Sequence, residues 1–124
     1  MNNKRLGTVL ERRVVKCLTE GGWWVHFITP NAAGQQPFDI IAVKHGTALA
    51  IDCKTCADDV FRFDRLEENQ KFAFERWLKC GNHEPYLIVE HVCKMYCIPY
   101  TILRDNRVVL LKDDLKWGLD ARWK

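Results

Sequence analysis

The sequence lacks any long run of apolar residues, although apolar side chains make up 48% of its 124 positions. No stretch approaches the roughly 20 consecutive apolar residues that a bilayer-spanning helix needs. The first seven residues contain two basic side chains, but no apolar stretch follows them as it would in a secretory signal. We therefore expect a cytoplasmic protein without a membrane segment.

The sequence also lacks internal repeats, low-complexity tracts and linker-like segments. A chain of this length has room for one domain, and it buries roughly two-thirds of its unfolded surface on folding. We therefore expect residues 1–124 to form a single domain. Neither sign of charge dominates, and the formal net charge of +3 permits a nucleic-acid partner without requiring one.

Cysteine is well represented, and its six copies would suggest disulfides in a secreted protein. Without an export signal we expect reduced thiols instead. The pairs Cys53/Cys56 and Cys93/Cys97 leave open a zinc-stabilised interaction domain. Both pairs lie in or beside apolar strand patterns, where cysteine acts as a small hydrophobic side chain, and this favours a structural role.

Hydrophobic periodicity predicts a helix, three strands, a second helix and then further strands. The first helix covers about residues 3–20 and ends at two glycines, and the second runs from Asp64 to Gly81. Strands are predicted at 23–28, 38–43, 48–53, 86–92, 96–103 and 108–111, with a turn at 104–106 and a short helix at 113–117. This order predicts an α/β fold in which a central mixed sheet is flanked by helices.

The residues that point to chemistry lie at the ends of two predicted strands. Asp39 opens one strand, and Asp52 and Lys54 close the next. Successive side chains of a strand point to opposite faces, so Asp52 and Lys54 share a face, and a hairpin can bring Asp39 to that face. Two adjacent carboxylates suit a hard divalent cation, and a neighbouring ammonium can stabilise charge on a phosphate during cleavage.

Such a triplet alone also describes an exposed ion pair at a strand end. Two further positions favour a functional site. Glu11 lies at the edge of the apolar stripe of the first helix, where an acid either faces the sheet or remains a solvated flanking residue. Gln70 lies within the apolar arc of the second helix, where its amide needs partners, either in the core or in the cleft.

The region from about Lys4 to Leu103 resembles the PD-(D/E)xK nuclease superfamily. The resemblance is carried by Gly7-x-x-x-Glu11, Pro37-Phe38-Asp39, Asp52-Cys53-Lys54 and Gln70. Within the superfamily the sequence looks most like the Holliday junction resolvases of the archaeal Hjc and bacterial RecU types. The resemblance implies a restriction-endonuclease-like fold, a metal-dependent endodeoxyribonuclease and a homodimer that cuts four-way junctions symmetrically. A viral replication-repair type nuclease acting on flaps, and a silent DNA-binding module, are the alternatives.

The resemblance also implies roles for individual residues. Glu11, Asp39 and Asp52 would bind Mg²⁺ or Mn²⁺ together with the carbonyl of Cys53. Lys54 would stabilise the transition state or orient the attacking water, and Gln70 would support it.

We also expect contacts between the protein and DNA phosphates. The loop over residues 30–36, with Gln36, would lie near the DNA by the same resemblance. The basic side chains expected to contact phosphates are Lys4, Arg5, Arg12, Arg62, Arg65 and Lys71. The alternative explanation for these charges is a pair of solvated helix faces.

Overall fold

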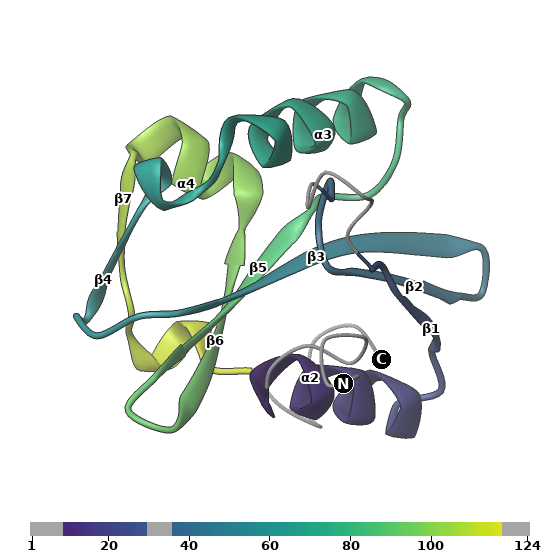
Figure 1. The fold of residues 1–124 in the computed structure, drawn as a ribbon, viewed down its shortest axis with the longest axis horizontal. Helices are drawn as coiled ribbons and strands as arrows, with labels where there is room; N and C mark the ends of the chain where they lie inside the picture. Colours follow the sequence, from purple (N-terminus) through teal and green to yellow (C-terminus); the bar gives the residue numbers. More distant parts are fainter. Residues whose placement is uncertain (1–8, 30–35, 118–124) are drawn as a thin grey trace.

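A mixed five-stranded sheet forms the centre of the fold in the computed structural model, which describes residues 9–29 and 36–117 (Figure 1). The strands lie in the order β1-β2-β3-β5-β6. Their bounds are β1 (Trp24–Phe27), β2 (Ile40–Lys44), β3 (Thr47–Thr55), β5 (Tyr86–His91) and β6 (Lys94–Pro99). β3 and β5 pair in parallel, whereas the other neighbours pair antiparallel. The predicted mixed sheet is therefore confirmed.

Helices cover both faces of this sheet. α2 (Val9–Glu20) packs on one face, and α3 (Glu68–Lys79) and α4 (Tyr100–Asn106) pack on the other (Figure 1). The alternation of strand side chains creates two apolar cores, because Ile51 of β3 packs against α2 and its neighbour Ala50 packs on the α3 side. None of the helices within the described ranges is long and apolar enough to cross a bilayer.

The first helix follows from its apolar spacing. Leu10, Val14 and Leu18 recur every four residues and are all buried against the sheet. The helix ends where predicted, at Gly21, and the next residue, Gly22, has a φ of 91°, which a side chain would disfavour. The predicted start near residue 3 lies outside the described residues.

The strand predicted at 96–103 is wrong in its second half. β6 ends at Pro99, which lacks a backbone N–H and lies in extended conformation directly before α4. Tyr100 and Leu103 are buried at helical spacing, whereas Ile102 is 47% exposed. The predicted turn at 104–106 is consequently the last turn of α4.

Three smaller features also differ from expectation. β4 (Val60–Arg62), which was not predicted, pairs with β7 (Val108–Leu110) to make a separate two-stranded sheet. The helix predicted from Asp64 begins as a 3-10 turn, η1 (Phe63–Arg65), and α3 starts only at Glu68. The last predicted helix is likewise a 3-10 turn, η2 (Asp113–Leu115).

The cysteines are not gathered into a group of zinc ligands within residues 9–29 and 36–117. All six are free thiols. Cys53 and Cys97 pack into the core beside α2, and the Cys56 thiol donates to the carbonyls of Asp58 and Val60. Within the part of the chain that the structure describes, no group of three His, Cys, Asp or Glu side chains is placed to hold a metal. The zinc-stabilised alternative therefore has no support.

Candidate active site

The end of β3 extends past its neighbour β2. β2 begins at Ile40, opposite Ile51, whereas β3 continues to Thr55 with β5 along its other edge. On the edge that β2 leaves uncovered, the backbone N–H of Cys53 donates to Oδ2 of Asp39 at 2.9 Å. The hairpin thus brings Asp39 to the end of β3, as expected from the sequence.

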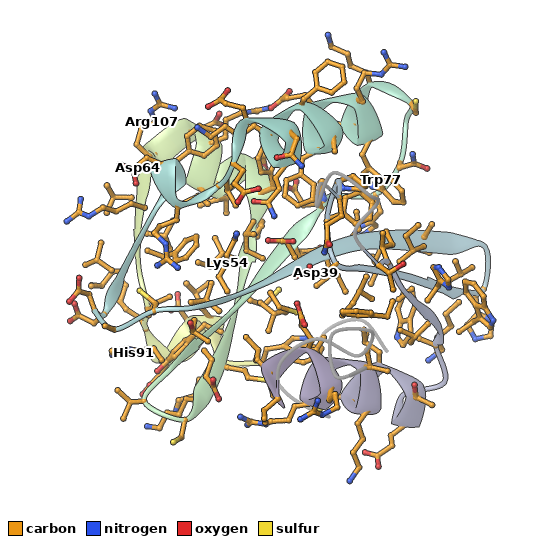
Figure 2. All side chains as sticks on the ribbon, in the orientation of Figure 1. Asp39, Lys54, Asp64, Trp77, His91 and Arg107 are labelled. Carbon is orange, nitrogen blue, oxygen red and sulfur yellow. The ribbon has the colours of Figure 1, made fainter. Side chains whose placement is uncertain are left out.

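Asp52 and Lys54 share the face of β3 that α3 covers. The side chain of Asp52 is only 1% exposed, and Nζ of Lys54 lies 3.5 Å from its Oδ2. Cys53 between them points to the opposite face, into the core beside α2. Figure 2 shows Asp39 and Lys54 near each other between the helical layers, in the middle of the molecule.

Gln70 joins this group from the first turn of α3. Its Oε1 accepts a hydrogen bond from the backbone N–H of Glu67 at 3.0 Å, which stabilises the start of the helix. Because the carbonyl end of the amide is used there, the NH₂ end faces the sheet and donates to Oδ2 of Asp52 at 3.1 Å. The amide of Gln70 therefore contacts a backbone group, as one alternative from the sequence had it, and also the carboxylate of Asp52.

One oxygen of Asp52 has no partner. Oδ1 is buried and accepts no hydrogen bond, while Oδ2 interacts with both Gln70 and Lys54. Burial, and then the charge of Asp39, raise the pKa of Asp52 well above its usual value, although Lys54 acts in the opposite direction. An unsatisfied carboxylate oxygen beside a second carboxylate is the chemistry that a hard cation satisfies, so this donor set fits a divalent metal.

Asp39 is held from two sides. In addition to Cys53, the side-chain amide of Gln36 donates to its Oδ1 at 2.5 Å. The carbonyl of Gln36 accepts a hydrogen bond from Asn69 of α3 at 2.7 Å. The structure therefore places Gln36, expected from the sequence to face DNA, against an acid of the site and links both to α3.

Glu11 approaches from the other face of the sheet. It is half-buried on α2. Burial is the main reason that the pKa of the Cys53 thiol is raised, followed by the charges of Asp39, Asp52 and Glu11. The Glu11 carboxylate therefore lies within electrostatic reach of the end of β3. It does not, however, form a ready three-carboxylate group with the two aspartates.

The basic residues predicted to contact DNA divide into two regions. Arg12 lies on α2, whereas Arg62, Arg65 and Lys71 lie together around the start of α3. Arg65 donates to the carbonyl of Thr55 at 2.9 Å, which ties this second region to the end of β3. Lys4 and Arg5 lie outside the described residues.

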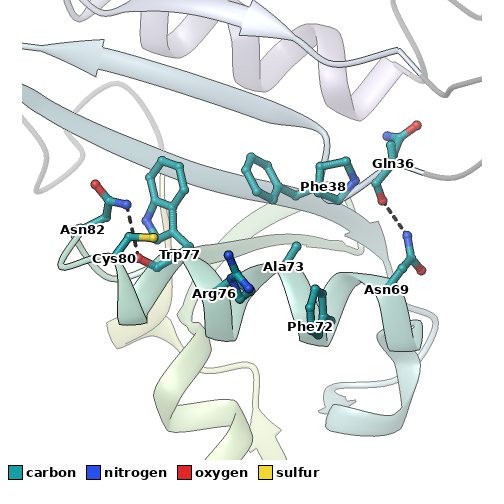
Figure 3. Close-up of a pocket in the computed structure, with 10 residues that line it drawn as sticks. Gln36, Phe38, Asn69, Phe72, Ala73, Arg76, Trp77, Cys80 and Asn82 are labelled. Atoms are coloured by element: carbon teal, nitrogen blue, oxygen red, sulfur yellow. Dashed lines mark hydrogen bonds between the residues drawn. The ribbon is translucent and has the colours of Figure 1, made fainter.

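A hollow of about 560 Å³ lies on the outer side of α3 (Figure 3). Aromatic side chains dominate its lining, including Phe38, Phe72 and Trp77, and Arg76 is the only cation among the lining residues. Gln36 links its rim to Asp39. Neither Asp39 nor Asp52 lines this hollow, so it is separate from the group of side chains at the end of β3.

Comparison with known proteins identifies the fold and the family of this chain. The structure of Hjc from Archaeoglobus fulgidus, a Holliday junction resolvase from an archaeal hyperthermophile, matches with a TM-score of 0.60 and 22% identity over 77% of this chain and 78% of that chain. At this identity the likeness shows a shared fold. No relative was found among curated proteins. The model of the archaeal Holliday junction resolvase (Hjc) family matches residues 2–120, nearly the whole sequence, and the chain therefore belongs to that family.

Proposed function

We propose that this resolvase hydrolyses DNA strands at four-way junctions with a divalent metal held at the end of β3. The proposal rests on the neighbouring carboxylates of Asp39 and Asp52. The Oδ1 atom of Asp52 is buried and accepts no hydrogen bond. Mg²⁺ or Mn²⁺ suits such oxygen ligands. When bound, the ion would neutralise the two acids and supply an activated water.

The remaining ligands would come from the same edge of the sheet. The N–H and C=O of one strand residue point to the same side, so the carbonyl of Cys53 faces the uncovered edge where its N–H meets Asp39. Glu11 would complete the set from α2, since its charge already acts on Cys53. A set of carboxylates and one carbonyl is typical of a hard-cation site.

Lys54 and Gln70 would act on the phosphate side of this site. The side chain of Lys54 is 18% exposed, so its ammonium can reach a DNA phosphate while remaining beside Asp52. There it would stabilise the negative charge that builds up on the non-bridging phosphate oxygens during attack. Gln70 is a positioning residue, because its amide fixes the carboxylate of Asp52 relative to α3.

A cleavage assay tests the proposal on a four-way junction, with linear duplex, flap and single-stranded DNA as controls. With Mg²⁺ we expect paired symmetric nicks on the junction and none in EDTA. Asp52→Asn should abolish cleavage and retain junction binding in Ca²⁺, whereas Asp114→Asn, a matched change at an exposed aspartate of η2, should cleave normally. Cleavage of flaps instead would assign the site to another branch of the superfamily. Absence of metal-dependent cleavage would favour the silent binding module.

We also propose a homodimer, because two symmetric cuts need two sites and each chain supplies one Asp39–Asp52 pair. The exposed aromatic surface of α3, where Phe72 is 66% exposed, has the composition that subunit interfaces favour. Light scattering should give a particle mass of twice the 14.6 kDa chain mass for the wild type, and Phe72→Lys should lower the particle mass to that of one chain. A monomeric wild-type protein that still makes paired cuts would contradict this arrangement.

A further inference from the structure

A second, basic hollow of about 240 Å³ lies at the junction of β4, η1, α3 and the end of α4. It is lined by Arg62, Phe63, Asp64, Lys71, Arg107 and Val108. Three of these side chains are cationic and one is anionic. Figure 2 marks Asp64 and Arg107 in this region, at the end of the molecule where α3 begins. Because its cations come from separate elements, the fold itself concentrates positive charge here.

The cations are organised by an aromatic ring. Nζ of Lys71 lies 4.5 Å from the ring centroid of Phe63, and the guanidinium carbon of Arg107 lies 4.9 Å from it. Phe63 in turn packs on Tyr100 in the core, with ring centroids 6.2 Å apart. Such cation–π contacts orient the charges and leave their N–H groups free to face a ligand.

Few carboxylates compete for these cations. Among the described residues, neither Arg62 nor Arg107 forms an ion pair. Lys71 pairs with Glu68 at 3.1 Å, but Glu68 is 91% exposed, and a surface pair of this kind is weak. An anion entering the hollow would therefore meet three cationic side chains and one carboxylate, Asp64, so the lining stays net positive.

The backbone of Arg107 supplies an independent observation. Its φ of 69° is in the left-handed region, at the C-terminal end of α4 where glycine is the usual residue. Hydrogen bonds hold this conformation, from its N–H to Leu103 at 2.7 Å and from the N–H of Phe63 to its carbonyl at 2.8 Å. A long cationic side chain at a position that favours glycine points to a role for the side chain.

The hollow lies on the same side of the sheet as the candidate active site. Lys71 directly follows Gln70, which contacts Asp52, and Arg65 of η1 is bonded to Thr55 at the end of β3. Resting on the proposed nuclease function, we propose that Arg62, Lys71 and Arg107 bind a backbone phosphate of the DNA strand, beyond the phosphate that is cut. Such a contact fixes the strand relative to Asp52 and Lys54 without reading its sequence.

Arg107→Gly tests this assignment, because it removes the guanidinium and relieves the left-handed backbone at the same time. The melting temperature should be equal to or above that of the wild type. Binding to junction and duplex is measured by fluorescence anisotropy in Ca²⁺ over a range of KCl concentrations. The salt slope should fall by about 1, with affinity about five- to tenfold weaker near 0.1 M salt. Arg62→Gln should lower the salt slope and the DNA affinity by similar amounts. Lys94→Gln, at an exposed lysine that begins β6, is the control and should match the wild type.

The outcomes separate this inference from the proposed function. If Arg107→Gly is stable and binds DNA with the wild-type slope and affinity, the phosphate assignment is wrong, whatever the cleavage assay shows. If the wild type cuts no junction but Arg107→Gly still binds DNA more weakly, the phosphate-binding role of the hollow is supported and the nuclease proposal is wrong. A further arm measures melting in inorganic phosphate against KCl of equal ionic strength. Inorganic phosphate could raise the melting temperature of the wild type but not of Arg107→Gly, while both proteins bind DNA equally well. That result would assign the hollow to a small phosphate ion and would contradict the DNA contact.

Discussion

Replacing Asp52 by asparagine should stabilise the protein in the absence of metal. The substitution keeps the shape of the side chain, and the new amide oxygen can still accept the hydrogen bond from Gln70. It removes a buried charge that faces Asp39 and has an unpartnered oxygen. The NH₂ group that replaces Oδ1 can donate to the Asp39 carboxylate, and a hydrogen bond to a charged group contributes about 1.5–3 kcal/mol. The lost ion pair with Lys54 offsets part of this, so we expect a net gain of about 1–2 kcal/mol. For a domain of this size that raises the melting temperature by roughly 3–8 °C.

The gain should depend on pH in a defined direction. The pKa of Asp52 in the folded protein is raised above its usual value of 3.8, so folding favours the protonated acid. This contribution to stability is complete below about pH 3.8 and is lost as the pH rises through the higher pKa of the folded state. The difference in melting temperature between Asp52→Asn and wild type should therefore be small at low pH and grow towards neutral pH.

Divalent cations should reverse the order of stability. Mg²⁺ or Ca²⁺ at about 100 times its dissociation constant would stabilise the wild type by roughly 2.7 kcal/mol, and the variant by much less. The assay is thermal unfolding of both proteins in EDTA and in metal, from pH 5 to 9. An Asp52→Asn protein that is less stable than wild type in EDTA throughout this range would refute the reasoning, because the ion pair of Asp52 with Lys54 would then outweigh its burial and its repulsion from Asp39.

Three further results are expected. Gln70→Glu can still accept the hydrogen bond from Glu67 but replaces the donor to Asp52 with a third buried carboxylate, so without metal it should lower the melting temperature more than Gln70→Ala does. Both variants should lower cleavage, and a Gln70→Glu protein as stable as wild type at neutral pH would contradict this reasoning. Tyr100→Phe loses the 2.7 Å hydrogen bond to Glu75 and should cost about 1 kcal/mol in urea unfolding, with junction cleavage unchanged; a larger loss of cleavage would show that this end of α4 acts on the site. Phe74→Ala empties a fully buried position under α3 and should cost about 3–5 kcal/mol; a cost below 1 kcal/mol would contradict the close packing of that core.

The local patterns of the sequence were sufficient to predict which candidate residues the fold brings together at the end of β3. Strand alternation placed Asp52 and Lys54 on one face, and the glycine turn after β2 brought Asp39 near them. Both features depend on neighbours within a few residues along the chain. The buried position of Gln70 could also be predicted, because apolar residues at helical spacing lie on both sides of it along α3.

The features that were missed depend on contacts distant in sequence or on very short elements. α4 has only seven residues, too few for helical periodicity to stand out from the alternation of the strand before it. β4 acquires its identity only by pairing with β7, almost fifty positions later. The link from Gln36 to α3 through Asn69, and the meeting of Arg107 with Phe63, likewise appear only once the chain is folded.

The parallel pairing of β3 with β5 has a consequence for synthesis of the protein. All the proposed catalytic residues lie before Lys79, so they leave the ribosome ahead of β5. Yet Asp52 and Lys54 are aligned on the strand that β5 supports, opposite Leu87 and Val89. A nascent chain that ends with α3 therefore has every proposed reactive group and strands β1, β2 and β3, but it lacks β5, which pairs with the end of β3. The end of β3 that carries the candidate site is therefore completed only when the second half of the chain has been made and has paired with it.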